Sequence, residues 1–114
     1  MDKKNLEIDE EEFEYILYKA LGPSWGQVLK LVILAEKPIT AQRITEISQI
    51  NQEQVRSSIE FFTKIGLFEK ASSGYEMTKD IKKVEVAIER ISVGNDGAAV
   101  QRLFVILESI VENK

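Results

Sequence analysis

The 114-residue chain contains no cysteine and no histidine. Disulfide bonds, thiol chemistry, zinc-finger ligation and a histidine general base are therefore excluded. Carboxylates are abundant, but neither a glycine-rich phosphate-binding loop nor a metal-binding motif accompanies them. The sequence thus predicts a protein that is not an enzyme and that needs no cofactor or metal.

Long apolar runs are also lacking. No run approaches the roughly 18 residues that a membrane-spanning helix requires. The first residues, MDKKNLEIDEEE, contain no apolar stretch of the kind found in a secretion signal. Hydrophobic residues make up 44% of the chain and charged residues 30%, proportions typical of a globular domain. We therefore expect a cytoplasmic protein of single-domain size without membrane contact.

The chain has no excess of basic charge. Its formal net charge is −4, with 15 Lys and Arg against 19 Asp and Glu. The acidic excess lies in residues 1–20 and 84–114, whereas residues 36–83 are close to neutral. This middle segment would repel nucleic acid least, although it is far from a basic patch.

Two helices are predicted at the start of the chain. Asp9, followed three residues later by Glu12, resembles a capping box for a helix over residues 10–21. Ser24 is a suitable N-cap for a second helix over residues 25–36. The second helix is apolar nearly all round, so it should be covered on two sides. The second cover could be the N-terminal helix, the C-terminal helix or a partner subunit.

A short helix, a turn and a longer helix come next. Thr40 is a suitable N-cap for a helix over residues 41–48, and Asn51 for a helix over residues 52–65. Gly66 should end the longer helix, because glycine tolerates positive φ. The residues expected to face the core are Ala41, Ile44, Ile47, Val55, Ile59, Phe62 and Ile65.

The apolar period then changes from helical to alternating. Strands are expected over residues 67–71 and 75–78. The segment between them, SSG at residues 72–74, has the composition of a tight turn. These features predict a β-hairpin.

Two further helices are predicted at the end of the chain, one opened by Asp80 and one over residues 98–112. Each carries an apolar stripe, formed by Ile81, Val84, Ile88 and Ile91 in the first and by Val100, Leu103, Phe104, Leu107, Ile110 and Val111 in the second. A small domain has few surfaces to cover these stripes. We therefore expect them to pair two subunits; the alternative is that they fold back on their own subunit.

The segments ITAQRITEISQINQEQVRSSIEFFTKIGLFEK and GYEMTKD together resemble the winged helix-turn-helix. Within them, VRSSIEFFTKIGLFEK resembles a recognition helix that runs into the first wing strand, and YEMT resembles the Tyr-x-Leu-Thr that closes the wing. The resemblance implies a mainly α fold with a small β-hairpin wing. It divides the chain into an N-terminal helix (1–23), a winged helix-turn-helix (24–80) and C-terminal helices for dimerisation (81–114).

The helical extensions are similar to those of bacterial and archaeal transcription regulators of the MarR-like sort, in which terminal helices pair two subunits. The resemblance therefore implies a homodimeric regulator that places the helix over residues 52–65 in the major groove of double-stranded DNA. Arginine can pair with guanine, glutamine with adenine, and serine with either a base or a phosphate. The candidate base-reading residues are Gln52, Gln54, Arg56 and Ser57, and the candidate phosphate contacts are Thr40, Arg43, Lys64 and Lys70.

Acidic side chains favour a different partner. Glu53 and Glu60 are predicted on the same outer ridge as Ser57, where phosphates would repel them. The tip of the hairpin also carries no basic side chain. The alternative interpretation is a protein-interaction module within a transcription, replication or repair assembly, with Glu60 and Lys64 forming a surface ion pair.

Overall fold

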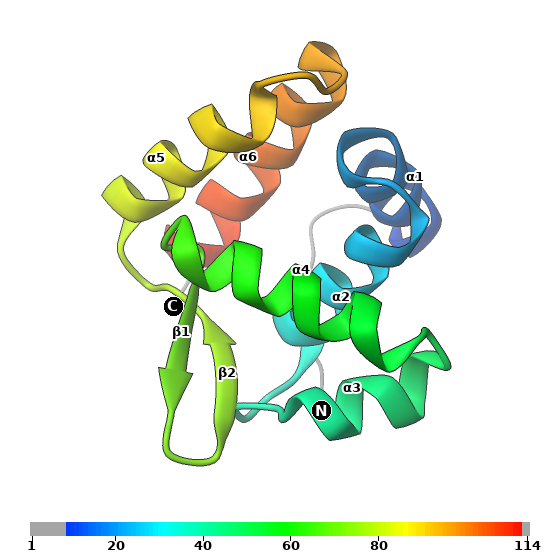
Figure 1. Ribbon diagram of the computed structural model, residues 1–114. Helices are drawn as coiled ribbons and strands as arrows, with labels where there is room; N and C mark the ends of the chain where they lie inside the picture. Colours follow the sequence, from blue (N-terminus) through cyan, green and yellow to red (C-terminus); the bar gives the residue numbers. More distant parts are fainter. Residues whose placement is uncertain (1–8, 113–114) are drawn as a thin grey trace.

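The computed structural model describes residues 9–112. Over this range it contains six α-helices and one two-stranded antiparallel sheet, so the expectation of a mainly α fold with a small β-hairpin is confirmed (Figure 1). The elements in chain order are α1 (Glu10–Leu21), α2 (Pro23–Leu34), α3 (Ala41–Ser48), α4 (Gln52–Lys64), β1 (Phe68–Ala71), β2 (Gly74–Met77), α5 (Ile81–Ser92) and α6 (Gly97–Glu112).

Helix α2 lies at the centre of the fold. Its buried apolar residues, Val28, Leu29, Val32 and Ile33, are covered by α1 on one side and by α4 on the other. The expectation of a helix with two covered sides is therefore confirmed, and both covers belong to the same chain. Figure 1 shows α4 crossing the molecule, with the hairpin beside its C-terminal end and α3 beside its N-terminal end.

Asp9 is the N-cap residue of α1 as predicted, but the capping box is wrong, and so is the predicted Ser24 cap of α2. The Asp9 side chain makes no capping hydrogen bond, and the Glu12 carboxylate instead forms an ion pair with Arg102 of α6. Helix α2 begins at Pro23, whose fixed φ suits the first turn of a helix and whose missing N–H needs no cap. The Ser24 hydroxyl donates to the side-chain oxygen of Gln54 at 3.3 Å.

Helices α3 and α4 start as the sequence predicts. The Thr40 hydroxyl accepts a hydrogen bond from the Arg43 N–H, and the Asn51 side-chain oxygen accepts one from the Glu53 N–H. One buried position in α3 was predicted wrongly, because Ile47 is 45% exposed. Helix α3 is short and touches its neighbours along a narrow stripe that Ile44 fills.

The end of α4 sets the direction of the chain into the hairpin. Gly66 has a φ of +92°, which closes a turn in which its N–H donates to the Thr63 carbonyl. The Leu67 N–H donates to the Phe62 carbonyl at 2.9 Å. This pair of bonds is a Schellman motif, and it confirms Gly66 as the residue that ends the helix.

The predicted hairpin is confirmed, but its turn is shorter than the predicted turn over residues 72–74. Phe68 pairs with Met77 and Ala71 with Gly74, which leaves a two-residue turn, Ser72 and Ser73. A single residue before α3, Ile39, extends the sheet by bonding Tyr75 in both directions at 2.9 and 2.8 Å. The hairpin is therefore held against the start of α3 as well as the end of α4.

The C-terminal helices α5 and α6 pack against each other, and α6 also packs against α1. Val84, Ile88 and Ile91 of α5 are buried by these contacts, as are Leu103 and Leu107 of α6. The apolar stripes of α5 and α6 are therefore covered by helices of the same chain. This agrees with the alternative expectation, in which these helices fold back on their own subunit. The two stripes therefore no longer support a dimer, and the homodimer stays a prediction.

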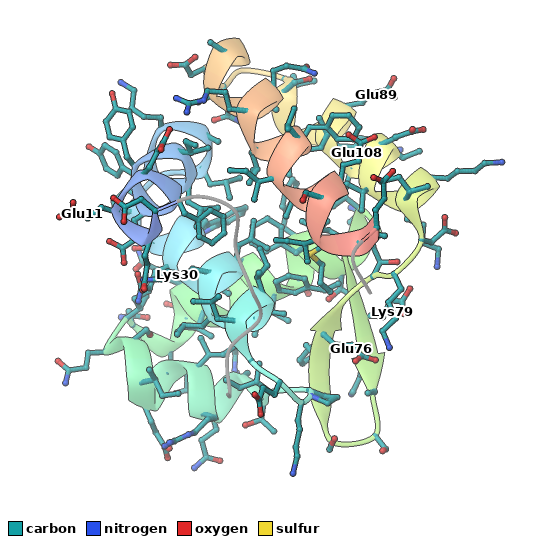
Figure 2. The ribbon with its side chains drawn as sticks, turned by 180° about the vertical axis from the view of Figure 1, so that it is seen from behind. Glu11, Lys30, Glu76, Lys79, Glu89 and Glu108 are labelled. Carbon is teal, nitrogen blue, oxygen red and sulfur yellow. The ribbon has the colours of Figure 1, made fainter. Side chains whose placement is uncertain are left out.

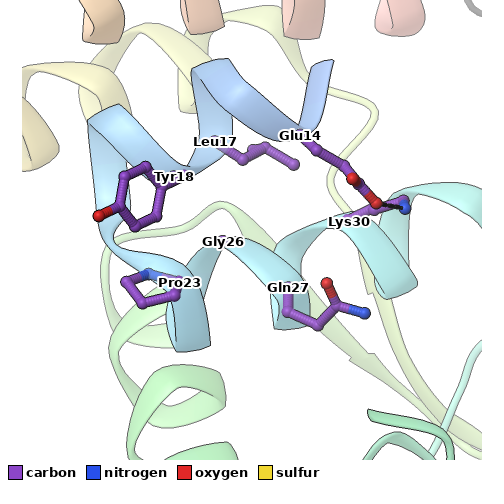
Figure 3. A pocket seen from close by; sticks show the side chains of 7 residues that line it. All are labelled: Glu14, Leu17, Tyr18, Pro23, Gly26, Gln27 and Lys30. Atoms are coloured by element: carbon purple, nitrogen blue, oxygen red, sulfur yellow. Dashed lines mark hydrogen bonds and ion pairs between the residues drawn. The ribbon is translucent and has the colours of Figure 1, made fainter. Parts of the chain in front are cut away.

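One lysine is buried where α1 crosses α2. Lys30 is 8% exposed, and its ammonium contacts Glu14 and, at 3.0 Å, Glu10. From behind, Figure 2 shows Lys30 beside α1, whereas Glu11 points outward. The ion pair closes one end of a hollow of about 200 Å³ that includes Tyr18 and Gln27 (Figure 3).

These contacts change the acidity of the ammonium. Burial alone lowers the pKa of Lys30, but the hydrogen bonds and negative charges of Glu14 and Glu10 outweigh burial, and the pKa lies above its ordinary value of 10.5. Because folding raises this pKa, the stabilisation is fully present below the unfolded pKa and is lost as the pH rises through the folded pKa.

Glu14→Gln is expected to lower the free energy of unfolding by about 1 kcal/mol at neutral pH, because Lys30 loses one charged partner and keeps a neutral acceptor. The difference from wild type should shrink as the pH rises through the folded pKa of Lys30, which lies above 10.5. Urea denaturation of both proteins, at neutral pH and at a pH above the folded pKa of Lys30, measures this difference. The matched control is Glu85→Gln on the exposed face of α5, which should show no such pH dependence. An effect of Glu14→Gln that is the same at both pH values would contradict the assignment.

Candidate nucleic-acid interface

Helix α4 buries one face and exposes the other. Val55, Ile59 and Phe62 are buried, whereas Arg56 and Ser57 are exposed, as the helical period predicts. The remaining exposed side chains along the same outer face are Gln52, Glu53, Gln54, Glu60 and Lys64. The four candidate base-reading residues therefore share one accessible face.

Aromatic packing fixes the position of α4. The Phe62 ring is fully buried, with its centroid 5.9 Å from that of Trp25 in α2 and 5.0 Å from that of Phe68 in β1. Phe61 packs against the other side of Trp25 at 5.2 Å. Since these rings connect α2, α4 and β1, the exposed face of α4 is presented on a rigid base.

A groove of about 560 Å³ separates α4 from the hairpin. It brings together Arg56 and Lys64 of α4 and Lys70 of β1, three of the predicted contact residues. Ala41 places the N-terminus of α3 at its edge. The complete lining is Ala41, Arg56, Ile59, Glu60, Thr63, Lys64, Lys70 and Tyr75.

The groove is positively charged. It holds three cations and one carboxylate, Glu60. Within residues 9–112, none of these cations forms an ion pair with a protein carboxylate, and the alternative ion pair between Glu60 and Lys64 is not formed. The Lys70 ammonium lies 6.0 Å from the centre of the Tyr75 ring, at the outer limit of a cation–π contact. The three cations are therefore available to an anion from outside.

Thr63, which lines the groove, has a polar atom without a partner. The Thr63 hydroxyl oxygen is buried and makes no hydrogen bond to the described part of the protein. Buried hydroxyls usually have a partner, but this oxygen is closed off from the groove and therefore gives no evidence of a ligand there. No pattern in the sequence indicates that Thr63, Tyr75 and Ala41 line a groove, because their positions there depend on how the hairpin packs.

A second hollow lies near the N-terminus of α4, between its exposed face and Trp25 of α2. It measures about 580 Å³ and is lined by Trp25, Asn51, Glu53, Gln54 and Ser57. The Gln54 side-chain oxygen accepts a hydrogen bond from the Ser24 hydroxyl, and its amide N–H groups can still donate. This hollow brings together two predicted base-reading residues, Gln54 and Ser57, but not Gln52.

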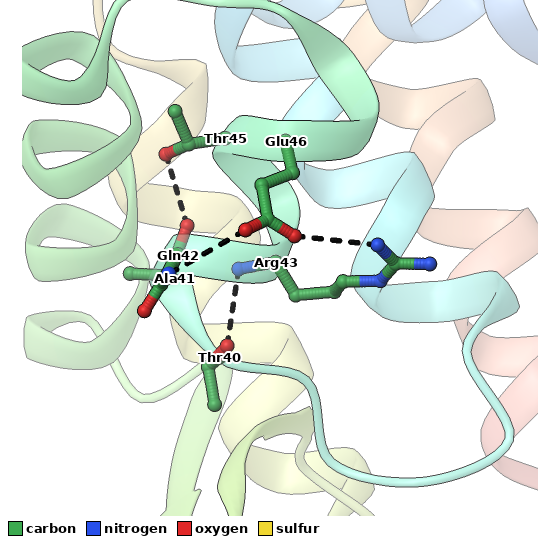
Figure 4. Close-up of polar contacts among 6 residues, drawn as sticks. All are labelled: Thr40, Ala41, Gln42, Arg43, Thr45 and Glu46. Atoms are coloured by element: carbon green, nitrogen blue, oxygen red, sulfur yellow. Dashed lines mark hydrogen bonds and ion pairs between the residues drawn. The ribbon is translucent and has the colours of Figure 1, made fainter.

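Thr40 and Arg43 are less available than the sequence predicts (Figure 4). The Thr40 hydroxyl already accepts from the Arg43 N–H at 3.0 Å. The Arg43 guanidinium lies 3.3 Å from the Glu46 carboxylate one turn away. Both side chains are exposed, but their first role is to hold α3 together.

Other kinds of site are not found in the described range. Residues 9–112 contain no group of three or more carboxylates placed to hold a metal ion. Within the same range, no helix combines the length and apolar character needed to cross a bilayer.

Comparison of the chain with protein-family models, with curated proteins and with solved structures finds no significant match in any of the three. The function of the chain is therefore inferred from the geometry and the charges of α4 and the hairpin.

Proposed function

We propose that the chain is a winged-helix transcription regulator that binds double-stranded DNA with α4 in the major groove and the β1–β2 hairpin as its wing. The observation that carries this proposal is the exposed face of α4 next to a groove holding Arg56, Lys64 and Lys70. A recognition helix beside a cationic groove can read bases while the neighbouring strand of DNA passes over the cations.

The side chains divide into two groups by their position. Gln54, Arg56 and Ser57 lie in the first half of α4, where base contacts of a recognition helix are usual, and Gln52 is its first residue. Lys64 is the last residue of α4 and Lys70 lies in β1, so both are away from the usual base contacts and serve as phosphate contacts, which carry no sequence information. The short turn of the hairpin has only Ser72 and Ser73 at its tip, so the proposed wing contributes through Lys70 rather than through its tip.

The proposal includes a homodimer, because one subunit offers few cations and non-specific affinity falls steeply with salt. Two subunits would double the contacts and place half-sites about 34–36 Å apart. Tyr15 and Tyr18 on α1 and Val105 on α6 remain more than half exposed and give a second copy some apolar surface to cover. Sedimentation at micromolar concentration tests this, and a stable monomer would refute it.

Arg56→Ala is expected to weaken binding to a preferred duplex about tenfold or more, because the bidentate contact of arginine with guanine is lost together with one positive charge. Fluorescence anisotropy at low and moderate salt measures the change. Arg90→Ala removes the same charge from an exposed position on α5 and should leave the affinity within about twofold of wild type.

A different result would favour the second candidate function. Glu53 and Glu60 are both exposed on the outer face of α4, which suits a basic protein partner better than it suits phosphates. If the folded protein bound no duplex even at low salt, the DNA-binding proposal would be wrong. A protein-interaction module within a larger assembly would then be the better interpretation.

A further inference from the structure

Glu60 occupies an unusual place for an acidic side chain. It is exposed and lines the groove together with Arg56, one helical turn earlier, and Lys64, one turn later. Neither cation forms an ion pair with it within residues 9–112. Where contact with DNA displaces the water around Glu60, this acceptor-only group needs a donor from the duplex, and phosphates offer none.

Duplex DNA offers few suitable donors. In the major groove, the N4 amino group of cytosine and the N6 amino group of adenine are the hydrogen-bond donors. The N6 group of adenine lies beside the N7 acceptor of the same base, which repels a carboxylate, whereas cytosine presents only its donor. Cytosine is therefore the base whose major-groove edge best matches the hydrogen-bond acceptors of the Glu60 carboxylate.

Arg56 has the complementary preference. Its guanidinium can donate two hydrogen bonds to O6 and N7 of guanine. Four residues of helix separate Arg56 from Glu60, a rise of about 6 Å, which is close to two base-pair steps of about 3.4 Å. Both side chains can thus reach base edges in one short stretch of duplex while Lys64 and Lys70 hold the phosphates beside it.

We propose that Glu60 is a specificity-determining residue that reads cytosine, with Arg56 reading guanine one or two base pairs away, so that the half-site contains G·C pairs at both positions. This inference rests on the proposed DNA-binding function. Glu53 is not part of the pair, because it lines the separate hollow near the N-terminus of α4 and not the groove.

The test begins with selection of binding sites from randomised duplexes by the full-length wild-type protein. The selected sites should contain a C·G pair one or two base pairs from the guanine that Arg56→Ala no longer prefers. Changing that C·G pair to T·A should weaken wild-type binding about tenfold, because the O4 acceptor of thymine then faces the Glu60 carboxylate.

Glu60→Gln supplies the decisive comparison. Its amide can donate to thymine O4, so this variant should bind the T·A duplex at least as well as the C·G duplex. Glu85→Gln removes the same charge from exposed α5 and should keep the wild-type preference for C·G. The ratio of the two affinities for each protein, rather than either affinity alone, is the quantity that separates base reading from a general change in charge.

The possible failures are distinguishable. If wild-type protein binds no duplex, the proposed function itself is wrong. If wild-type protein binds duplex but shows no cytosine preference, or if Glu60→Gln keeps the wild-type preference, then Glu60 does not read a base, while the DNA-binding proposal stands.

Discussion

Phe62→Ala is expected to lower the free energy of unfolding by about 3–5 kcal/mol, which is a large part of the stability of a domain of this size. The ring is fully buried and lies within 6 Å, centroid to centroid, of Trp25, Phe61 and Phe68. Removing it opens a cavity at the point where α2, α4 and β1 meet. Neighbouring aromatic rings are too stiff to fill that cavity completely.

Urea denaturation followed by circular dichroism measures the loss, and the single tryptophan, Trp25, reports on the cavity directly by its fluorescence. Phe62→Leu is the matched variant, because it keeps most of the apolar volume and should cost clearly less. If Phe62→Ala lost less than about 1 kcal/mol, Phe62 could not be the side chain that fixes α4 against α2 and β1.

The orientation of α4 could be predicted from the sequence, because it depends on local periodicity alone. Val55, Ile59 and Phe62 recur at helical spacing, so the opposite residues must face outward wherever the helix lies. Asn51 and Gly66 marked the two ends of α4 by their own side-chain and backbone chemistry. Such features need no knowledge of the rest of the fold.

The groove could not be predicted in the same way. Arg56 and Lys70 meet there because Ile39, far earlier in the chain, bonds Tyr75 and holds the hairpin toward α4. The burial of Lys30 is also a long-range effect, since it requires α1 to bring Glu10 and Glu14 across α2. Similarly, Glu12 looked like part of a capping box, but its partner, Arg102, lies 90 residues away.

Gly74→Ala is expected to displace the hairpin and to lower the free energy of unfolding by about 2–4 kcal/mol. Gly74 has a φ of +145°, and an added Cβ would lie 2.5 Å from the carbonyl carbon of Ile39. The obstacle is backbone rather than a flexible side chain, so the strand must move. The two hydrogen bonds between Ile39 and Tyr75 should then be lost.

Amide hydrogen exchange at Ile39 and Tyr75, together with urea denaturation, measures this effect. Gly94→Ala is the control, because Gly94 also has positive φ but an added Cβ there meets nothing within 4 Å, so only the backbone cost of about 1 kcal/mol remains. Under the DNA-binding proposal, Gly74→Ala should also weaken duplex binding at temperatures where the variant is folded, since Lys70 moves with β1 away from Arg56. Retained protection of both amides would show that the hairpin does not need the close approach of Gly74 to Ile39, and the position of Lys70 would then have to be explained by the end of α4 alone.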